Sequence, residues 1–128
     1  MCLELYVIPA TEKKVSAERL ARASGLWAKK VNNPVKGAIR FSRDGSCSCS
    51  LLADDADWDK PIWALEDGVP EELAAALQLL RNEAGGLTLR AIWKGDEAET
   101  EGELSLSQML DEVRSNRVRN RHTCKVRT

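Results

Sequence analysis

Three cysteines and the single histidine of the chain are residue types that could form a metal or thiol site. They stand in two pairs with one residue between the members, Cys47 with Cys49 and His122 with Cys124. Zinc accepts thiolate and imidazole ligands, and three cysteines with one histidine form a sufficient set. Structural zinc sites usually space their ligands two to four residues apart on a turn, so buried thiols that pack as small apolar side chains are the competing interpretation. A zinc or thiol site is therefore an alternative prediction.

A second group with possible chemistry is the acidic stretch between positions 54 and 66. Its carboxylates alternate, and Glu66 follows at the distance of the last ligand of a calcium loop. Lys60 stands where such a loop needs glycine, so a solvated acidic surface is the competing interpretation. Tryptophans among the carboxylates would suit a cationic partner through cation–π contacts. We predict a partner-binding surface made of Asp55, Asp57, Trp58, Asp59 and Trp63.

The C-terminal residues are a third candidate because they are strongly basic. Residues 113–128 carry six Lys/Arg and no Asp/Glu. Such a cluster can neutralise the phosphates of a nucleic acid, and Arg117, Arg119 and Arg121 are predicted to meet a partner. No aromatic residue follows Trp93, so nothing indicates base stacking. The other interpretation is that the segment binds acidic residues of the same chain or of a second copy.

The net charge of −1 is the sum of stretches with opposite charge. Residues 1–50 carry nine Lys/Arg against four Asp/Glu, and residues 51–112 carry four against sixteen. The local net charges are therefore +5 and −12, followed by +6 at the C-terminus. This partition excludes a uniformly basic nucleic-acid binder and a uniformly acidic disordered chain. It predicts a protein partner, with a homo-oligomer among the options.

Apolar spacing and turn signals predict the elements in the first half of the chain. Alternation over residues 3–7, before Pro9, predicts a strand. Ser16 is a suitable N-cap for a helix whose apolar face continues to Val31, with Gly25 inside it or at a pause.

Residues 38–52 have the pattern of a β-hairpin. Two strand-like runs flank the turn residues Asp44 and Gly45. The alternation favours a register with Phe41 opposite Cys47, which turns the cysteines of the second strand toward the core.

The second half of the chain gives the clearest local signals. Pro70 in a first turn predicts a helix with an apolar stripe to Ala84, and residues 87–93 form a strand-like run. Ser105 and Gln108 form a capping box for a last helix.

The order strand, helix, strand, strand, helix, strand predicts an α+β fold. The expected architecture is a split βαβ (ferredoxin-like) antiparallel sheet with two helices on one face plus a C-terminal helix. Residues 94–103 are expected to be a mobile connection. We predict one domain over residues 1–116, followed by a basic C-terminal tail or short edge strand over residues 117–128.

The functional prediction is a small cytoplasmic, non-enzymatic binding or interaction module. Four cysteines without a secretory pattern predict reduced thiols, and no apolar run reaches the length of a bilayer crossing. One histidine and the lack of a glycine-rich phosphate loop give little basis for catalysis, so no cofactor is expected. The expected partner is protein, including a second copy. The alternatives are polyanion binding through the basic tail, with nucleic acid as the polymer, and the zinc or thiol site.

Overall fold

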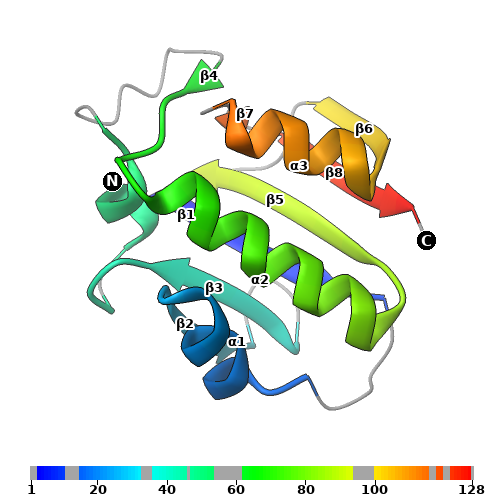
Figure 1. The fold of residues 1–128 in the computed structure, drawn as a ribbon, viewed down its shortest axis with the longest axis horizontal. Coiled ribbons are helices and arrows are strands. Elements are labelled where there is room, and N and C mark those ends of the chain that lie inside the picture. The colour runs from blue at the N-terminus through cyan, green and yellow to red at the C-terminus, as the bar shows by residue number, and fades with distance from the viewer. Residues whose placement is uncertain are drawn as a thin grey trace.

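The computed structural model describes residues 3–10, 15–32, 36–45, 47–53, 62–93, 100–115, 118–119 and 122–127. These residues form an α+β fold in which three α-helices lie on one face of a six-stranded mixed sheet (Figure 1). The helices are α1 (Ala17–Ser24), α2 (Val69–Ala84) and α3 (Leu106–Arg114), and a 3₁₀ helix covers Ser48–Leu51. The strands are β1 (Leu3–Pro9), β2 (Trp27–Val31), β3 (Ala38–Ser42), β4 (Ile62–Trp63), β5 (Leu87–Trp93), β6 (Thr100–Ser105), β7 (Val118–Arg119) and β8 (His122–Arg127).

The strand order of the large sheet is β2-β3-β1-β5-β8-β6. Neighbouring strands are antiparallel except β6 and β8, which run parallel. Parallel neighbours need a crossover connection, and α3 lies in the connection between them. β4 and β7 form a separate two-stranded sheet.

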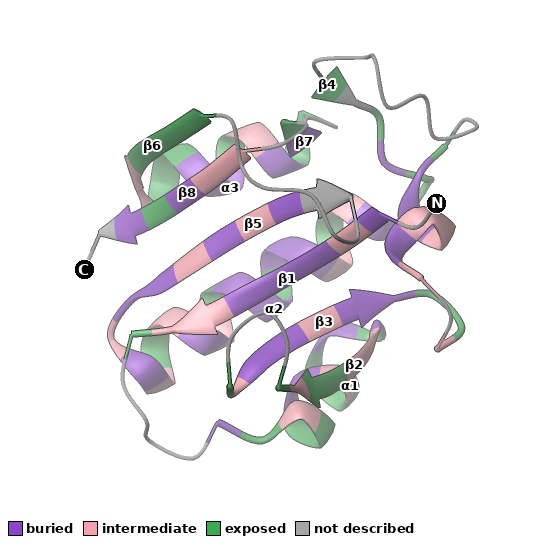
Figure 2. Ribbon diagram, turned by 180° about the vertical axis from the view of Figure 1, so that it is seen from behind, coloured by how far each residue is buried: buried purple, intermediate pink, exposed green. Residues whose placement is uncertain are grey.

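The main core lies between the sheet and the helices. On β1 the alternate residues Leu3, Leu5 and Val7 enter this core, together with the apolar stripe of α2. Tyr6 points to the opposite face, where it forms a small separate cluster with Ala38. Figure 2 shows this opposite face, with the helices behind the sheet. The alternation of β1 therefore divides its side chains between a helix-covered face and a face without helices among the described residues.

The elements with strong local signals are confirmed. β1 and β5 occupy the predicted strands, and α2 begins one residue before Pro70. In α3, the Ser105 Oγ accepts the N–H of Gln108 at 3.2 Å, and the Gln108 Oε1 accepts the N–H of Ser105 at 2.9 Å. The predicted capping box is therefore formed.

The predicted long helix from Ser16 to Val31 is wrong in its second half. α1 ends after Ser24 because Gly25 adopts a left-handed conformation with a φ of 85°, and its N–H donates to the carbonyl of Ala21. The remaining residues form β2, which pairs antiparallel with β3. Their apolar spacing suited either a helix or a strand, and the sheet contact selects the strand.

The predicted hairpin of residues 38–52 is also wrong in its second half. β3 already has β1 on one side and β2 on the other, so it has no free edge for a third partner. The chain instead turns into the 3₁₀ helix, where the buried Ser48 hydroxyl accepts the N–H of Leu5 at 2.9 Å and donates to the carbonyl of Phe41 at 2.5 Å. This side chain joins β1 to β3 at the end of their ladder.

The C-terminal part of the sheet differs from the expectation in two ways. The expected connection of residues 94–103 ends earlier, because Thr100 begins β6. β8 is internal, with β5 on one side and β6 on the other, so it is not an edge strand. The sheet is therefore mixed and has six strands, where an antiparallel sheet was predicted.

Candidate functional site

The structure places the two cysteine-containing pairs in separate parts of the fold. Cys49 lies in the 3₁₀ helix, where its Sγ accepts the N–H of Leu3 at 3.2 Å, and Cys47 is the residue directly before that helix. His122 and Cys124 lie on β8, and β5 separates β8 from β1. Among the described residues, no three His, Cys, Asp or Glu side chains are grouped so that they could hold a metal ion.

His122 and Cys124 face a small cavity beneath α3. Its volume is about 20 Å³, which is room for one water molecule, and its wall includes Met109, Glu112 and Arg119. Burial raises the pKa of the Cys124 thiol, and the negative charge of Glu112 raises it further. The protonated, weakly nucleophilic form of this thiol is therefore favoured at neutral pH.

His122 is held as a neutral side chain. Its Nδ1 lies 2.7 Å from the Oγ1 of Thr100. Burial lowers the pKa of His122 and the positive charge of Arg119 lowers it further, while Glu112 acts in the opposite direction. Protonation of this ring is consequently less favourable in the folded protein than in the unfolded chain.

We expect acidification to destabilise the protein through His122. Because its pKa in the folded state lies below the ordinary 6.5, the unfolded chain binds more protons, and the free energy of unfolding falls as the pH drops through that value. The chain has one histidine, so urea unfolding at about pH 7 and about pH 5.5 reports mainly on this residue. His122→Gln, which keeps an acceptor for Thr100, is expected to flatten this dependence. If the free energy of unfolding changes equally with pH in the wild type and in His122→Gln, the destabilisation by acid does not come from His122.

The predicted acidic surface lies mostly outside the described residues. This applies to Asp55, Asp57, Trp58 and Asp59. Trp63 is in β4, and its backbone pairs with Val118 of β7. The structure therefore places one end of this surface beside the start of the C-terminal segment.

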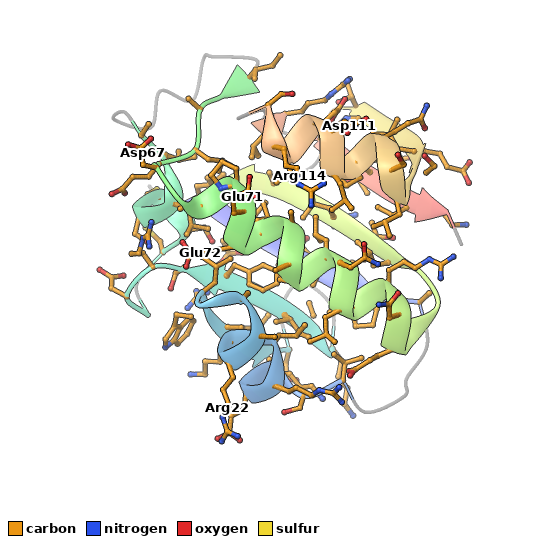
Figure 3. All side chains as sticks on the ribbon, viewed as in Figure 1. Arg22, Asp67, Glu71, Glu72, Asp111 and Arg114 are labelled. Atoms are coloured by element: carbon orange, nitrogen blue, oxygen red, sulfur yellow. The ribbon has the colours of Figure 1, made fainter. Side chains whose placement is uncertain are left out.

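The basic segment has internal acidic partners in this structure. Arg117 and Arg121 lie outside the described residues, whereas Arg119 forms an ion pair with Glu112 at 2.5 Å. Arg114 is the last residue of α3, and its Nε is 3.9 Å from the Oε2 of Glu71 on α2 (Figure 3). Two of the basic side chains thus meet acidic residues of the same chain, in agreement with the intramolecular interpretation of the charge partition.

A row of polar side chains crosses the sheet face opposite the helices, which we call the open face. Six strands contribute one residue each at the same level: Lys29, Arg40, Tyr6, Arg90, Thr123 and Glu101. The strand register alone aligns them, because residues that are partners across neighbouring strands point to the same face.

The centre of this row is a connected network around Arg90. Its Nη1 donates to the hydroxyl of Tyr6 at 3.0 Å, and its Nε donates to the Oγ1 of Thr123 at 2.8 Å. The guanidinium carbon lies 5.9 Å from the centre of the Tyr6 ring. Burial raises the pKa of Tyr6, partly offset by the hydrogen bond from Arg90, so the hydroxyl stays protonated. The guanidinium of Arg90 is therefore fixed from two sides.

Arg40 forms the second half of the row. Its guanidinium carbon lies 5.7 Å from the centre of the Trp27 ring, and its Nη1 is 3.9 Å from the Oε1 of Glu4. Its buried Nε has no hydrogen-bond partner among the described residues. Glu4 offsets part of the positive charge at this end.

A groove of about 690 Å³ lies at one end of the open face. A second cross-strand row forms its wall, from Ile8 through Thr88 and Lys125 to Glu103. The other residues that line the groove are Pro9, Ala10, Gly86, Leu87 and Val126. Lys125 is exposed and has no ion pair with any described residue.

This groove combines the ammonium group of Lys125, a hydroxyl group and an apolar floor, with the carboxylate of Glu103 at its β6 end. Such a combination can bind an anionic group while it covers an attached apolar part. Of its residues only Lys125 and Val126 lie in the basic C-terminal segment that was predicted as a surface. The available signal was alternation: Tyr6, Arg90 and Lys125 each stand between buried neighbours in their strands.

Comparisons with known proteins do not assign this chain to a family. In the described part of the chain, no helix has the length and apolar character needed to span a bilayer. No protein-family model matches the chain, and neither a curated protein nor a solved structure is significantly similar to it.

Proposed function

We propose that this chain is a non-enzymatic binding module whose open face holds a small anionic ligand with an apolar part. The observation that carries the proposal is the exposed ammonium of Lys125, without an ion pair to any described residue, on the wall of a 690 Å³ groove. A groove of this volume suits a ligand of ordinary metabolite size. Thr88 beside Lys125 supplies a hydroxyl that can donate to the same anion.

The charges around the groove favour a small anion over a long polyanion. Glu101 and Glu103 lie on the neighbouring strand β6, in register with Thr123 and Lys125. Their carboxylates would repel the continuing phosphates of a nucleic acid. Tyr6 is 1% exposed and is not available to stack a base.

The apolar residues of the groove favour an amphipathic ligand. Ile8 and Pro9 are half-buried and lie beside the polar row. A carboxylate or phosphate monoester with a hydrocarbon portion would bury apolar surface there and pair its charge with Lys125. Inorganic phosphate alone would gain only the ionic contact.

The proposal is for binding because the reactive side chains lie elsewhere. His122 and Cys124 occupy the other face of β8, beneath α3. A buried cysteine in the thiol form also suits a reducing compartment, so a cytoplasmic location is part of the proposal.

The finer fold assignment is also proposed. Elements β1, α1, β2, β3, α2 and β5 follow the split βαβ (ferredoxin-like) order, and their strands lie in the antiparallel order β2-β3-β1-β5. We treat β8, β6 and α3 as an extension beside β5.

Calorimetric titration tests the proposed ligand class. Octanoate, a nucleoside monophosphate and inorganic phosphate are the probes, and the amphipathic anions are expected to bind more tightly than inorganic phosphate. Lys125→Gln removes the ammonium and is expected to weaken binding about tenfold, the loss of roughly one charge-assisted hydrogen bond.

Lys36→Gln is the matched control, because Lys36 is an exposed lysine in the turn before β3 and does not line the groove. It is expected to bind as the wild type does. The proposal fails if none of the probes binds, or if the Lys125 and Lys36 variants lose affinity equally.

A further inference from the structure

The two edge strands of the sheet carry opposite charges. β2 ends the sheet on one side with Lys29 and Lys30, and β6 ends it on the other side with Glu101 and Glu103. All four side chains are exposed, and none has an ion pair with a described residue. These charges are therefore available to a partner.

An edge strand offers backbone N–H and C=O groups to another strand. Within the described residues β2 pairs only with β3, and β6 pairs only with β8. Each edge is thus a template for the addition of a further strand.

The charges determine which edges are compatible. Two β2 edges would bring lysines together, and two β6 edges would bring glutamates together, so both symmetric pairings are disfavoured. A β2 edge beside a β6 edge, with the open faces on the same side, brings Lys29 next to Glu101 and Glu103, whereas Lys30 points to the helix-covered side. The charge pattern that blocks the symmetric contacts therefore favours the unlike contact.

We infer that copies of this chain associate edge to edge, with β2 of one copy added beside β6 of the next. Because the two edges lie at opposite ends of the sheet, each copy can bind two neighbours at once. A contact of this head-to-tail kind builds open chains, or rings where the rotation between copies closes, and does not stop at a dimer. Lys29 and Glu103 also border the open face, and Glu103 lines the groove, so association and ligand binding are measured separately.

Sedimentation velocity over a wide range of protein concentration tests the inference. In about 10 mM salt the wild type is expected to form oligomers that lengthen with concentration. In about 1 M salt, where the Debye length has fallen from about 30 Å to about 3 Å, association is expected to weaken at least about tenfold.

Charge reversal at either edge is expected to leave a monomer. The variants are Lys29→Glu with Lys30→Glu, and Glu101→Lys with Glu103→Lys. A mixture of the two is expected to associate again, because the reversed edges complement each other. The control combines Asp67→Lys with Asp111→Lys, two exposed residues on the helix side of the molecule, and should associate like the wild type (Figure 3).

Three results would overturn the inference. The first is a wild-type monomer at every concentration in low salt. The second is an assembly that stops at two copies. The third is association of the edge variants alone to the same extent as the wild type.

Discussion

Replacement of Ser48 with alanine is expected to lower the free energy of unfolding by about 2–4 kcal/mol, because two buried backbone groups lose their partner. The Ser48 hydroxyl accepts the N–H of Leu5 and donates to the carbonyl of Phe41. Ser48 and Phe41 are fully buried, and Leu5 is 1% exposed, so water cannot readily replace the hydroxyl. Urea unfolding monitored by circular dichroism measures the change.

Ser50→Ala is the matched control for this measurement. The Ser50 hydroxyl makes the same pair of contacts, because it accepts the N–H of Arg43 at 2.9 Å and donates to the carbonyl of Cys47 at 3.0 Å. Ser50 is more accessible, so water can take over these bonds and the expected loss is below about 1 kcal/mol. If both variants lose the same free energy of unfolding, burial of the Ser48 hydrogen bonds between β1 and β3 does not make them more stabilising than those of Ser50.

The same region shows where local sequence signals stop being sufficient. Gly45 does adopt a left-handed conformation, with a φ of 89°, so the predicted turn exists. The next element depends on whether β3 has a free edge, and β1 and β2 occupy both of its edges. No local pattern in residues 46–52 contains this information. The sequence predicts the turn, and the sheet determines the element after it.

The sequence predicted helices correctly where a capping signal and a long apolar stripe indicated the same element. α2 has an apolar stripe over 16 residues and Gly85 after its end, and α3 has a complete capping box. The β2 segment has neither feature, and its five residues suit both periods. Short amphipathic segments are therefore decided by their tertiary partners.

The polar residues of the open face could not be predicted as a group, because their proximity also depends on the order of the strands. Tyr6, Arg90 and Lys125 come from three strands that are distant in the sequence, and the register of the sheet brings them to one face. Alternation predicts that each faces away from the core. It does not predict which strands are neighbours, because the parallel pairing of β6 with β8 depends on the α3 crossover.

Some residues of the acidic and basic stretches contact each other within the same chain. Arg114 meets Glu71, Arg119 meets Glu112, and the basic strand β8 runs beside the acidic strand β6. Attraction between the acidic and basic stretches therefore contributes to the contacts of α3 with α2 and β7 and to the pairing of β8 with β6.

We expect Gly25→Ala to lower the free energy of unfolding by roughly 2–3 kcal/mol, through backbone strain and a steric contact together. Gly25 has a φ of +85°, which a residue with a Cβ adopts only at a cost. A Cβ at this position would lie 2.8 Å from the Oε2 of Glu72, which is too close. Glu72 is held by an ion pair with Arg43 at 3.2 Å, so its movement would disturb a contact between the end of β3 and α2.

Two comparisons separate these causes. Gly37 has nearly the same φ, +86°, but an added Cβ there would meet nothing within 4 Å, so Gly37→Ala should cost only the backbone part, about 1 kcal/mol. In a Glu72→Ala background the steric contact is absent, and Gly25→Ala should then cost about as much as Gly37→Ala. If Gly25→Ala remains as costly without Glu72, the contact is irrelevant and backbone strain at the end of α1 accounts for the whole effect. If both glycine variants are neutral, the left-handed residue does not enforce the change from α1 to β2.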